Sequence, residues 1–196
     1  DPLTRSYKSG DAFQSGARGR SLQPAIFIDS TGRAYSLAAH TLPSARGQGE
    51  PLSGRLDPPD GAKFAGVLMG EPEDLWLLAS DAGYGFTVRL GELLTDRKAG
   101  KAVLSVPEKA LVLPPVPVPS ADSLVAVVNS EGKLLVFPAS EVPELPKGKG
   151  NKLFGIAGKK AEAREEVLAG VAVVPPGGSL IVLSGERRMT LSTAEL

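Results

Sequence analysis

Four times along the chain, a short apolar run is followed by a turn and then by a second run in which apolar and polar residues alternate. Two such runs separated by a short polar turn are typical of an antiparallel β-hairpin. In the first three, the turn contains a glycine, which can supply the positive φ that a tight turn requires. The fourth keeps both runs and shortens the turn. The predicted hairpins span residues 25–37, 75–88, 124–137 and 180–191.

The predicted hairpins recur with a period close to fifty residues. The turn glycines Gly32, Gly83 and Gly132 lie 51 and 49 residues apart. A single small sheet cannot bury both of its faces, so a repeat of this length with about four strands is typical of blades arranged around an axis. The sequence therefore predicts an all-β fold of roughly four-stranded antiparallel blades in a single domain. We expect that domain to span 1–196, with a remnant of a preceding blade at 1–24 and repeats near 25–60, 61–110, 111–160 and 161–196.

The hairpin strands also predict the core. Their alternation places three pairs of apolar residues on one face, and the intervening residues are apolar enough to indicate that both faces are covered. The proline-rich segment 113–119 is expected to connect blades, since proline does not fit a central strand. Residues 161–168 are expected to form a short helix or a loop inserted in the repeat. The residues predicted to share one face are Ile26, Ile28, Trp76, Leu78, Val125 and Val127.

A loop rich in glycine and basic residues follows each of the first three hairpins. The aligned glycines Gly49, Gly100 and Gly150 lie 51 and 50 residues apart, so the loops repeat with the hairpins. Residues 7–13 resemble the same loop from a preceding repeat. We call these segments the Gly-basic loops, and the three complete ones span residues 44–50, 96–101 and 146–152.

In a radial fold, equivalent loops lie along one rim, so their cations would form an intermittent positive track. Lysine and arginine on such a track bind DNA phosphates without reading base sequence, and nearby glycines would let backbone amides approach the phosphates. The alternative is that these cations are ordinary solvated loop residues. The candidate DNA-binding residues are Lys8, Arg46, Arg97, Lys98, Lys101, Lys147, Lys149 and Lys152.

Charge is unevenly distributed among the loops. The net charge is zero, with 22 basic and 22 acidic residues, which argues against a surface that binds polyanions everywhere. Residues 145–160 contain five lysines and no acid, whereas the first two Gly-basic loops contain Glu50 and Asp96. We therefore expect the third loop to have the strongest positive field.

Composition excludes several classes of protein. The chain is 42% hydrophobic, which is enough for a core, and its 23 glycines and 17 prolines favour short strands joined by turns. The absence of cysteine excludes disulfides and zinc-thiolate sites and is compatible with the cytoplasm. No apolar run approaches the roughly 18 residues that cross a bilayer, so no membrane partner is expected. Because the chain begins at Asp1 without a methionine or signal sequence, we expect it to be part of a longer protein.

Catalytic chemistry has little support in the sequence. His40 is the only histidine, and no nucleophile motif lies beside it. Asp81 and Glu131 fall at hairpin turns, where acidic residues are common. The glycine pairs at 47–49 and 148–150 lack the Gly-Lys-Ser/Thr ending of a nucleotide-binding loop. We expect no catalytic group, no metal and no cofactor in this chain.

Segments 27–37, 41–51, 78–86 and 147–152 resemble the C-terminal domain of the topoisomerase IV A subunit, which is related to that of the gyrase A subunit. The resemblance implies a β-pinwheel, a propeller-like disc whose neighbouring blades exchange strands and whose rim binds duplex DNA. It also implies two further partners in a parent heterotetramer, the catalytic core of the same subunit and an ATPase B subunit. The parent protein would be an ATP-dependent type IIA topoisomerase, cytoplasmic and nucleoid-associated, that performs decatenation and supercoil relaxation.

Two alternatives remain open. The gyrase A relative wraps DNA through a basic Gln-Arg-Arg-Gly-Gly-Lys-Gly heptapeptide, and only degenerate versions occur here, at 46–50 and 147–150. Radial β arrays also bind proteins, but their protein-binding faces tend to expose aromatic anchors. Only 5% of the residues of this chain are aromatic, which favours DNA binding over this alternative. Tyr7, Tyr35 and Tyr84 lie within the repeats as packing residues, so the domain alone is not expected to cleave DNA.

Overall fold

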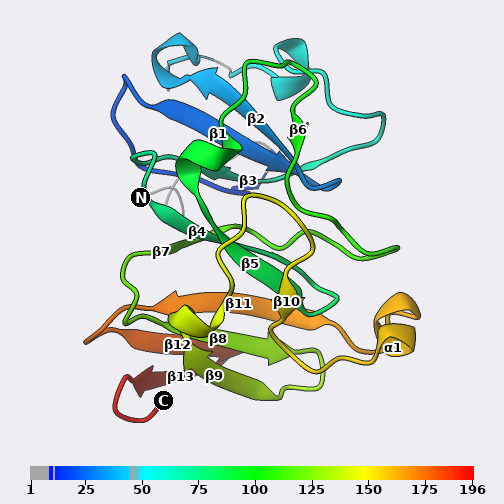
Figure 1. The fold of residues 1–196 in the computed structure, drawn as a ribbon, viewed down its shortest axis with the longest axis vertical. Helices are drawn as coiled ribbons and strands as arrows, with labels where there is room; N and C mark the ends of the chain where they lie inside the picture. Colours follow the sequence, from blue (N-terminus) through cyan, green and yellow to red (C-terminus); the bar gives the residue numbers. More distant parts are fainter. Residues whose placement is uncertain (1–8, 11, 45–46, 48) are drawn as a thin grey trace.

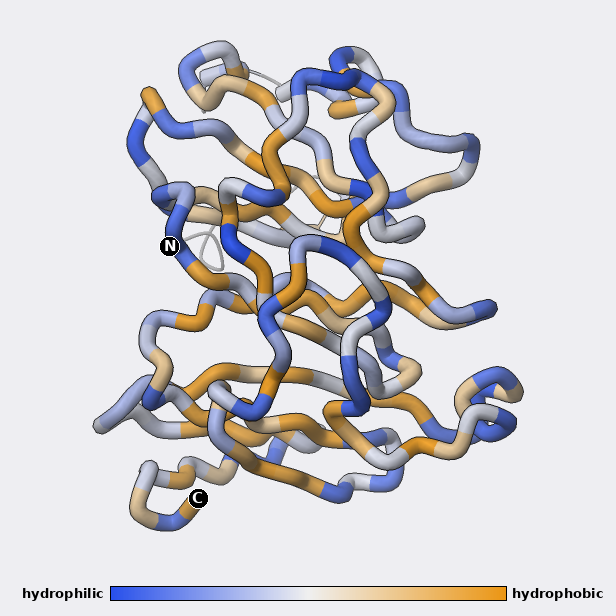
Figure 2. Tube along the Cα trace, viewed as in Figure 1, coloured by the Kyte–Doolittle hydropathy of each residue, from blue (hydrophilic) through white to orange (hydrophobic). Residues whose placement is uncertain are grey.

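The computed structural model describes residues 9–10, 12–44, 47 and 49–196, and its strands form four small sheets stacked along the molecule (Figure 1). Figure 2 shows that the strands are largely apolar and the loops at their ends largely hydrophilic. No helix in the described part of the chain is long and apolar enough to cross a membrane. The strands are β1 (Pro24–Asp29), β2 (Arg33–Ala38), β3 (Phe64–Leu68), β4 (Leu75–Ser80), β5 (Tyr84–Arg89), β6 (Lys101–Ala102), β7 (Val116–Val118), β8 (Leu124–Asn129), β9 (Leu134–Pro138), β10 (Asn151–Lys152), β11 (Leu168–Val174), β12 (Ser179–Ser184) and β13 (Arg187–Ser192). The helices are α1 (Gly158–Glu162) and the short 3-10 helices Ala39–Thr41, Leu52–Gly54, Leu90–Leu93 and Ala139–Glu141.

Each sheet is built around one predicted hairpin. The strand orders are β3-β1-β2-β6, β10-β5-β4-β7, β11-β8-β9 and β12-β13, and the strands pair antiparallel. The two-residue strand β6 comes after the hairpin β4-β5 in the chain but pairs with β2 of the first hairpin. In the same way, β10 comes after the hairpin β8-β9 but pairs with β5 of the second hairpin. This exchange of strands between repeats is the pinwheel arrangement, so the predicted all-β fold is confirmed. Among the described residues, the third and fourth sheets have three and two strands in place of about four.

The described residues ahead of β1 form no strand. The backbone N–H of Val67 in β3 donates to Ser15 Oγ at 3.3 Å, so this segment lies along the outer edge of the first sheet. The assignment of residues 1–24 to a preceding blade and the division into four repeats remain predictions.

The three predicted turn glycines have the expected backbone. The φ angles of Gly32, Gly83 and Gly132 are 80°, 89° and 79°, all in the left-handed region that favours glycine. In the shortened fourth hairpin, Gly185 has a φ of 58°. A local requirement of the turn therefore explains the glycine repeat.

The sheets bury their faces against one another in sequence. Ile26 and Ile28 of β1 pack with Trp76 and Leu78 of β4 in one cluster. The opposite face of β4 packs on β8 in a second cluster, and the opposite face of β8 packs on β12 in a third. Burial of both faces is confirmed, but the prediction that the six residues share one face is wrong, because Trp76 and Val125 face the preceding sheet whereas Ile26 faces the following one.

The error in the predicted faces is one residue of alignment. The turn glycines place Ile26 at the position of Leu77 in the next repeat, 51 residues on, and not at that of Trp76. Since successive side chains of a strand point to opposite faces, a slip of one residue exchanges the two faces.

A polar side chain beside each turn fixes the segment that leads into the next paired strand. At three equivalent positions the side chain accepts a backbone N–H from that segment, at distances of 2.8 to 3.2 Å, while its own N–H donates to a carbonyl of the same segment. Asp81 is therefore a structural turn residue. The equivalent pairs are Ser30 with Lys63, Asp81 with Leu111, and Ser130 with Val167.

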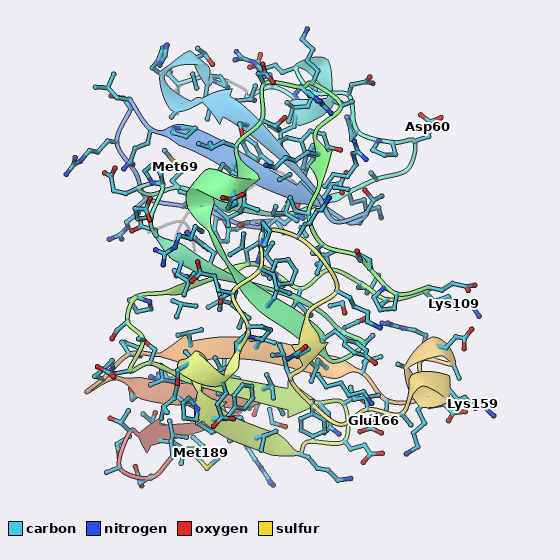
Figure 3. All side chains as sticks on the ribbon, in the orientation of Figure 1. Asp60, Met69, Lys109, Lys159, Glu166 and Met189 are labelled. Atoms are coloured by element: carbon cyan, nitrogen blue, oxygen red, sulfur yellow. The ribbon has the colours of Figure 1, made fainter. Side chains whose placement is uncertain are left out.

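The insertion predicted at 161–168 begins earlier, with the single turn of helix α1. It is fastened to two hairpin turns: Arg164 Nη2 lies 2.7 Å from Asp81 Oδ2, and Asn129 Nδ2 donates to Glu166 Oε1 at 2.8 Å. Figure 3 labels Glu166 beside α1, and its side chain is buried. The insertion therefore joins the second and third sheets.

Tyr35 provides a testable link between pH and stability. Its side chain is fully buried, and its hydroxyl donates to Asp29 Oδ2 at 2.6 Å. Burial and the adjacent carboxylate raise the pKa of Tyr35 above that of an exposed tyrosine. The folded chain thus keeps this proton where the unfolded chain loses it, so the stability is intact below a pH of about 10 and decreases above it.

Above a pH of about 10, the free energy of unfolding should decrease less steeply with pH in Tyr35→Phe than in the wild type, by up to about 1.4 kcal/mol per pH unit. At neutral pH the variant should be less stable by about 1 to 2 kcal/mol, because Asp29 loses a donor. Urea unfolding of both proteins between a pH of about 9 and 11 measures the two slopes. Equal slopes would show that Tyr35 does not contribute to the alkaline transition.

Candidate nucleic-acid interface

The second and third Gly-basic loops each dock on the sheet of the preceding repeat, the second loop on the first sheet and the third loop on the second sheet. In Figure 1 they cross the front of the first and second sheets, in green and yellow, before they enter β6 and β10. The registers are equivalent: Ala34 pairs with Lys101 in the first sheet, and Gly85 pairs with Asn151 in the second. The sequence repeat in these loops therefore corresponds to a structural repeat.

The glycines of these loops make the docking possible. Gly100 and Gly150 have φ angles of 64° and 79°. A Cβ on Gly100 would lie 2.7 Å from the carbonyl oxygen of Ala34, and one on Gly150 would overlap that of Gly85. The sequence predicts that such glycines bring backbone amides to phosphates. Their closest neighbours are instead the strands β2 and β5.

The two docked loops are also joined to each other. Gly148 of the third loop donates its N–H to the carbonyl of Val103 at 2.9 Å, and its carbonyl accepts the N–H of Ser105 at 2.8 Å. On the other side, the carbonyl of Lys98 accepts the N–H of Asp57 at 2.8 Å. Residues 96–105 and 146–152 thus form one hydrogen-bonded surface, which we call the loop ridge.

The cations of the loop ridge are largely available to a ligand. Lys101 is half-buried and the other described candidates are exposed. None of them forms an ion pair within the described part of the chain. Lys8 and Arg46 lie outside the described residues. The candidates that the structure brings together are Arg97, Lys98, Lys101, Lys147, Lys149 and Lys152.

Other cations are already neutralised. Arg89 contacts the carboxylates of Glu73 and Glu144 at 3.3 and 2.9 Å, and Arg55 pairs with Glu50. Glu50 therefore neutralises a residue outside its own Gly-basic loop. The described cations of the loop ridge differ from Arg89 and Arg55 in that they form no ion pair within the described part of the chain.

Two residues that contact the loops were missed in the sequence. Arg33 donates to the carbonyls of Ala99 and Gly100 at 2.8 and 3.0 Å, and the ring of Tyr84 lies under Lys149 Nζ, 4.2 Å from the ring centroid. Arg33 and Tyr84 each directly follow a turn glycine and are 51 residues apart. That periodicity could have identified them as equivalent.

No catalytic arrangement is formed by the described residues. His40 is exposed in a 3-10 helix, Asp81 is held by Arg164, and Glu131 pairs with Lys133, which lowers the pKa of Glu131. No group of three or more histidine, cysteine or acidic side chains that could hold a metal ion occurs in the described part of the chain. The loop ridge therefore remains the candidate site.

Comparison with known proteins assigns this arrangement to a family. The family model described as DNA gyrase C-terminal domain, beta-propeller, matches residues 74–118 and 123–175. The A subunit of DNA topoisomerase 4 from Pseudomonas aeruginosa is 53% identical over the whole chain, and that from Escherichia coli is 44% identical over 97% of it. The chain covers 26% and 25% of these relatives, about a quarter of their length.

Solved structures give the same assignment. The E. coli ParC C-terminal domain matches with a TM-score of 0.87 and 42% identity, over 100% of this chain and 79% of that one. A DNA gyrase A C-terminal domain matches with a TM-score of 0.66 and 16% identity, over 89% of this chain and 56% of that one, which supports the fold alone. The chain therefore belongs to the family of DNA gyrase C-terminal domains with a β-propeller fold, and within it is similar to the C-terminal domain of the topoisomerase IV A subunit.

Proposed function

We propose that this chain binds duplex DNA along the loop ridge, independently of base sequence. The observation that carries the proposal is the ridge itself: two equivalent docked loops, joined by hydrogen bonds, present six cations that form no ion pair within the described residues. Unpaired cations in a row bind a phosphate backbone by releasing its counterions. Contacts of this kind position DNA without reading its bases.

In the parent protein, the domain would hold DNA crossings for the catalytic core of the same polypeptide, which works with an ATPase B subunit. Decatenation and supercoil relaxation would be the reactions served, in the bacterial cytoplasm and at the nucleoid. Family membership supports this role, and the described residues offer no convergent catalytic groups. The bond-breaking chemistry would therefore reside in the core, and the domain alone would not cleave DNA.

A protein-interaction role is the second candidate. The last sheet exposes Ile181 and Leu183 on one face of β12, with 47% and 70% of their surfaces accessible. Exposed apolar residues that lie close together are typical of protein contacts. Gyrase-type wrapping has less support, since the chain contains only degenerate versions of the gyrase heptapeptide, at 46–50 and 147–150.

Titration of two unrelated duplexes by fluorescence anisotropy at several salt concentrations tests the proposal. We expect similar affinities for both duplexes and a steep loss of affinity with salt. Six cations, each in contact with one phosphate, set a limit of about −5 on the slope of log K against log salt concentration. Affinity that does not depend on salt, or that is confined to one duplex, would contradict sequence-independent binding on the ridge.

A further inference from the structure

The cation of Lys149 has a defined place on the loop ridge. Its Nζ lies over the ring of Tyr84, and Tyr84 is half-buried in β5 with its backbone paired to Lys152. The two side chains border a hollow of about 250 Å³ that Glu108 and Glu162 also line. Neither carboxylate forms an ion pair with Lys149 in the described structure. The ring is therefore the partner that holds this ammonium group.

The equivalent position in the first sheet uses the opposite arrangement. There the cation belongs to the strand: Arg33 donates to the carbonyls of Ala99 and Gly100, and its charge is directed at the loop backbone. Ala99 precedes Gly100 as Lys149 precedes Gly150. In the second sheet the strand carries the ring of Tyr84 and the loop carries the cation. In the second sheet, the cation of this pair is therefore on the loop and not on the strand.

An aromatic partner orients a lysine without cancelling its charge. Lys133 and Lys160 are held by carboxylates, Lys133 by Glu131 at 2.6 Å and Lys160 by Glu166 at 3.4 Å, so their fields are offset. The face of a ring attracts an ammonium group through its quadrupole and contributes no net charge. Lys149 thus keeps its full charge while it loses part of its rotational freedom.

We propose that Tyr84 is a positioning residue for DNA binding, which holds the Lys149 ammonium group in place for a phosphate. This inference rests on the proposed function and extends it to a residue that carries no charge. Binding DNA with a freely rotating lysine costs side-chain entropy, and a lysine already held on a ring avoids part of that cost. Tyr84 would therefore raise affinity without adding a phosphate contact.

The test compares Tyr84→Leu with Tyr84→Phe in the whole chain. Phenylalanine keeps the ring face, so its DNA affinity should stay within about twofold of wild type. Leucine removes the ring, so affinity should decrease by about three- to fivefold with an unchanged salt slope. Lys149→Gln should instead lower the magnitude of the slope by about one. In the Lys149→Gln background, Tyr84→Leu should have no further effect.

Lys147 provides the matched control, because it is an exposed lysine of the same loop with no ring beneath it among the described contacts. The effects of Tyr84→Leu and Lys147→Gln should simply add. The Lys149 ε-CH2 signals in a carbon-proton NMR spectrum give a readout without DNA: they should be shifted by the ring in wild type and Tyr84→Phe and unshifted in Tyr84→Leu. The same spectra report whether each variant is folded.

Wild-type affinity in Tyr84→Leu, tighter binding, or a loss that persists in the Lys149→Gln background would overturn the positioning role while leaving DNA binding on the ridge intact. A wild-type chain without salt-dependent binding would overturn both proposals. The two failures are therefore distinguishable.

Discussion

Replacing Lys147, Lys149 and Lys152 together by glutamine is expected to weaken DNA binding on the order of a hundredfold at about 0.1 M salt. All three residues are exposed, lie in one docked loop and form no ion pair within the described residues. If each contacts one phosphate, the slope of log K against log salt concentration should decrease in magnitude by up to about three. The loss should be the same for unrelated duplexes, because phosphate contacts carry no sequence information.

A charge-matched variant separates local contacts from the overall charge. Lys63, Lys109 and Arg187 are exposed and lie outside the Gly-basic loops; Figure 3 shows Lys109 at the edge of the molecule. Replacing these three by glutamine removes the same charge and should change affinity and slope much less. Arg46→Ala, although its site lies outside the described residues, should also cost less than the triple lysine change. Equal effects of the two triple variants would mean that DNA responds to net charge and not to the ridge.

Gly150→Ala is expected to destabilise the chain by roughly 3 kcal/mol. Gly150 combines a left-handed φ of 79° with a position where a Cβ would overlap the carbonyl of Gly85 in β5. The left-handed conformation alone costs about 1 to 2 kcal/mol for alanine, and relief of the overlap requires that β10 leave β5. The cost of undocking the loop sets the upper limit. DNA affinity should decrease as well, because the third Gly-basic loop loses its support.

Two glycines act as controls for this prediction. Gly49 has a φ of 73°, and a Cβ there would meet no atom within 4 Å, so Gly49→Ala should show only the conformational cost of about 1 to 2 kcal/mol. Gly155 has neither the left-handed backbone nor a close neighbour, so Gly155→Ala should be nearly neutral. Urea unfolding measures all three variants. If Gly150→Ala cost no more than Gly49→Ala, close docking of the loop would contribute nothing to stability.

The sequence by itself determined the features that depend on near neighbours. The hairpins, the left-handed turn glycines and the recurrence of the Gly-basic loops all follow from local patterns with a period near fifty. A hairpin needs only alternation and a turn that permits positive φ, and both are visible within a dozen residues. The repeat was also sufficient to predict an all-β array and to select six described cations that the structure brings onto one ridge.

The tertiary structure alone decided how the repeats meet. β6 and β10 have two residues each, too few for any pattern, and they pair with strands far away in the chain. The face of β1 that each residue occupies depended on a one-residue alignment with the next repeat. A strand buried on both faces is apolar at successive positions, so its sequence pattern cannot fix this alignment. The roles of Gly150, Arg33 and Tyr84 likewise arise from contacts across sheets. Such contacts depend on which segments pack together in space, and a local pattern contains no record of them.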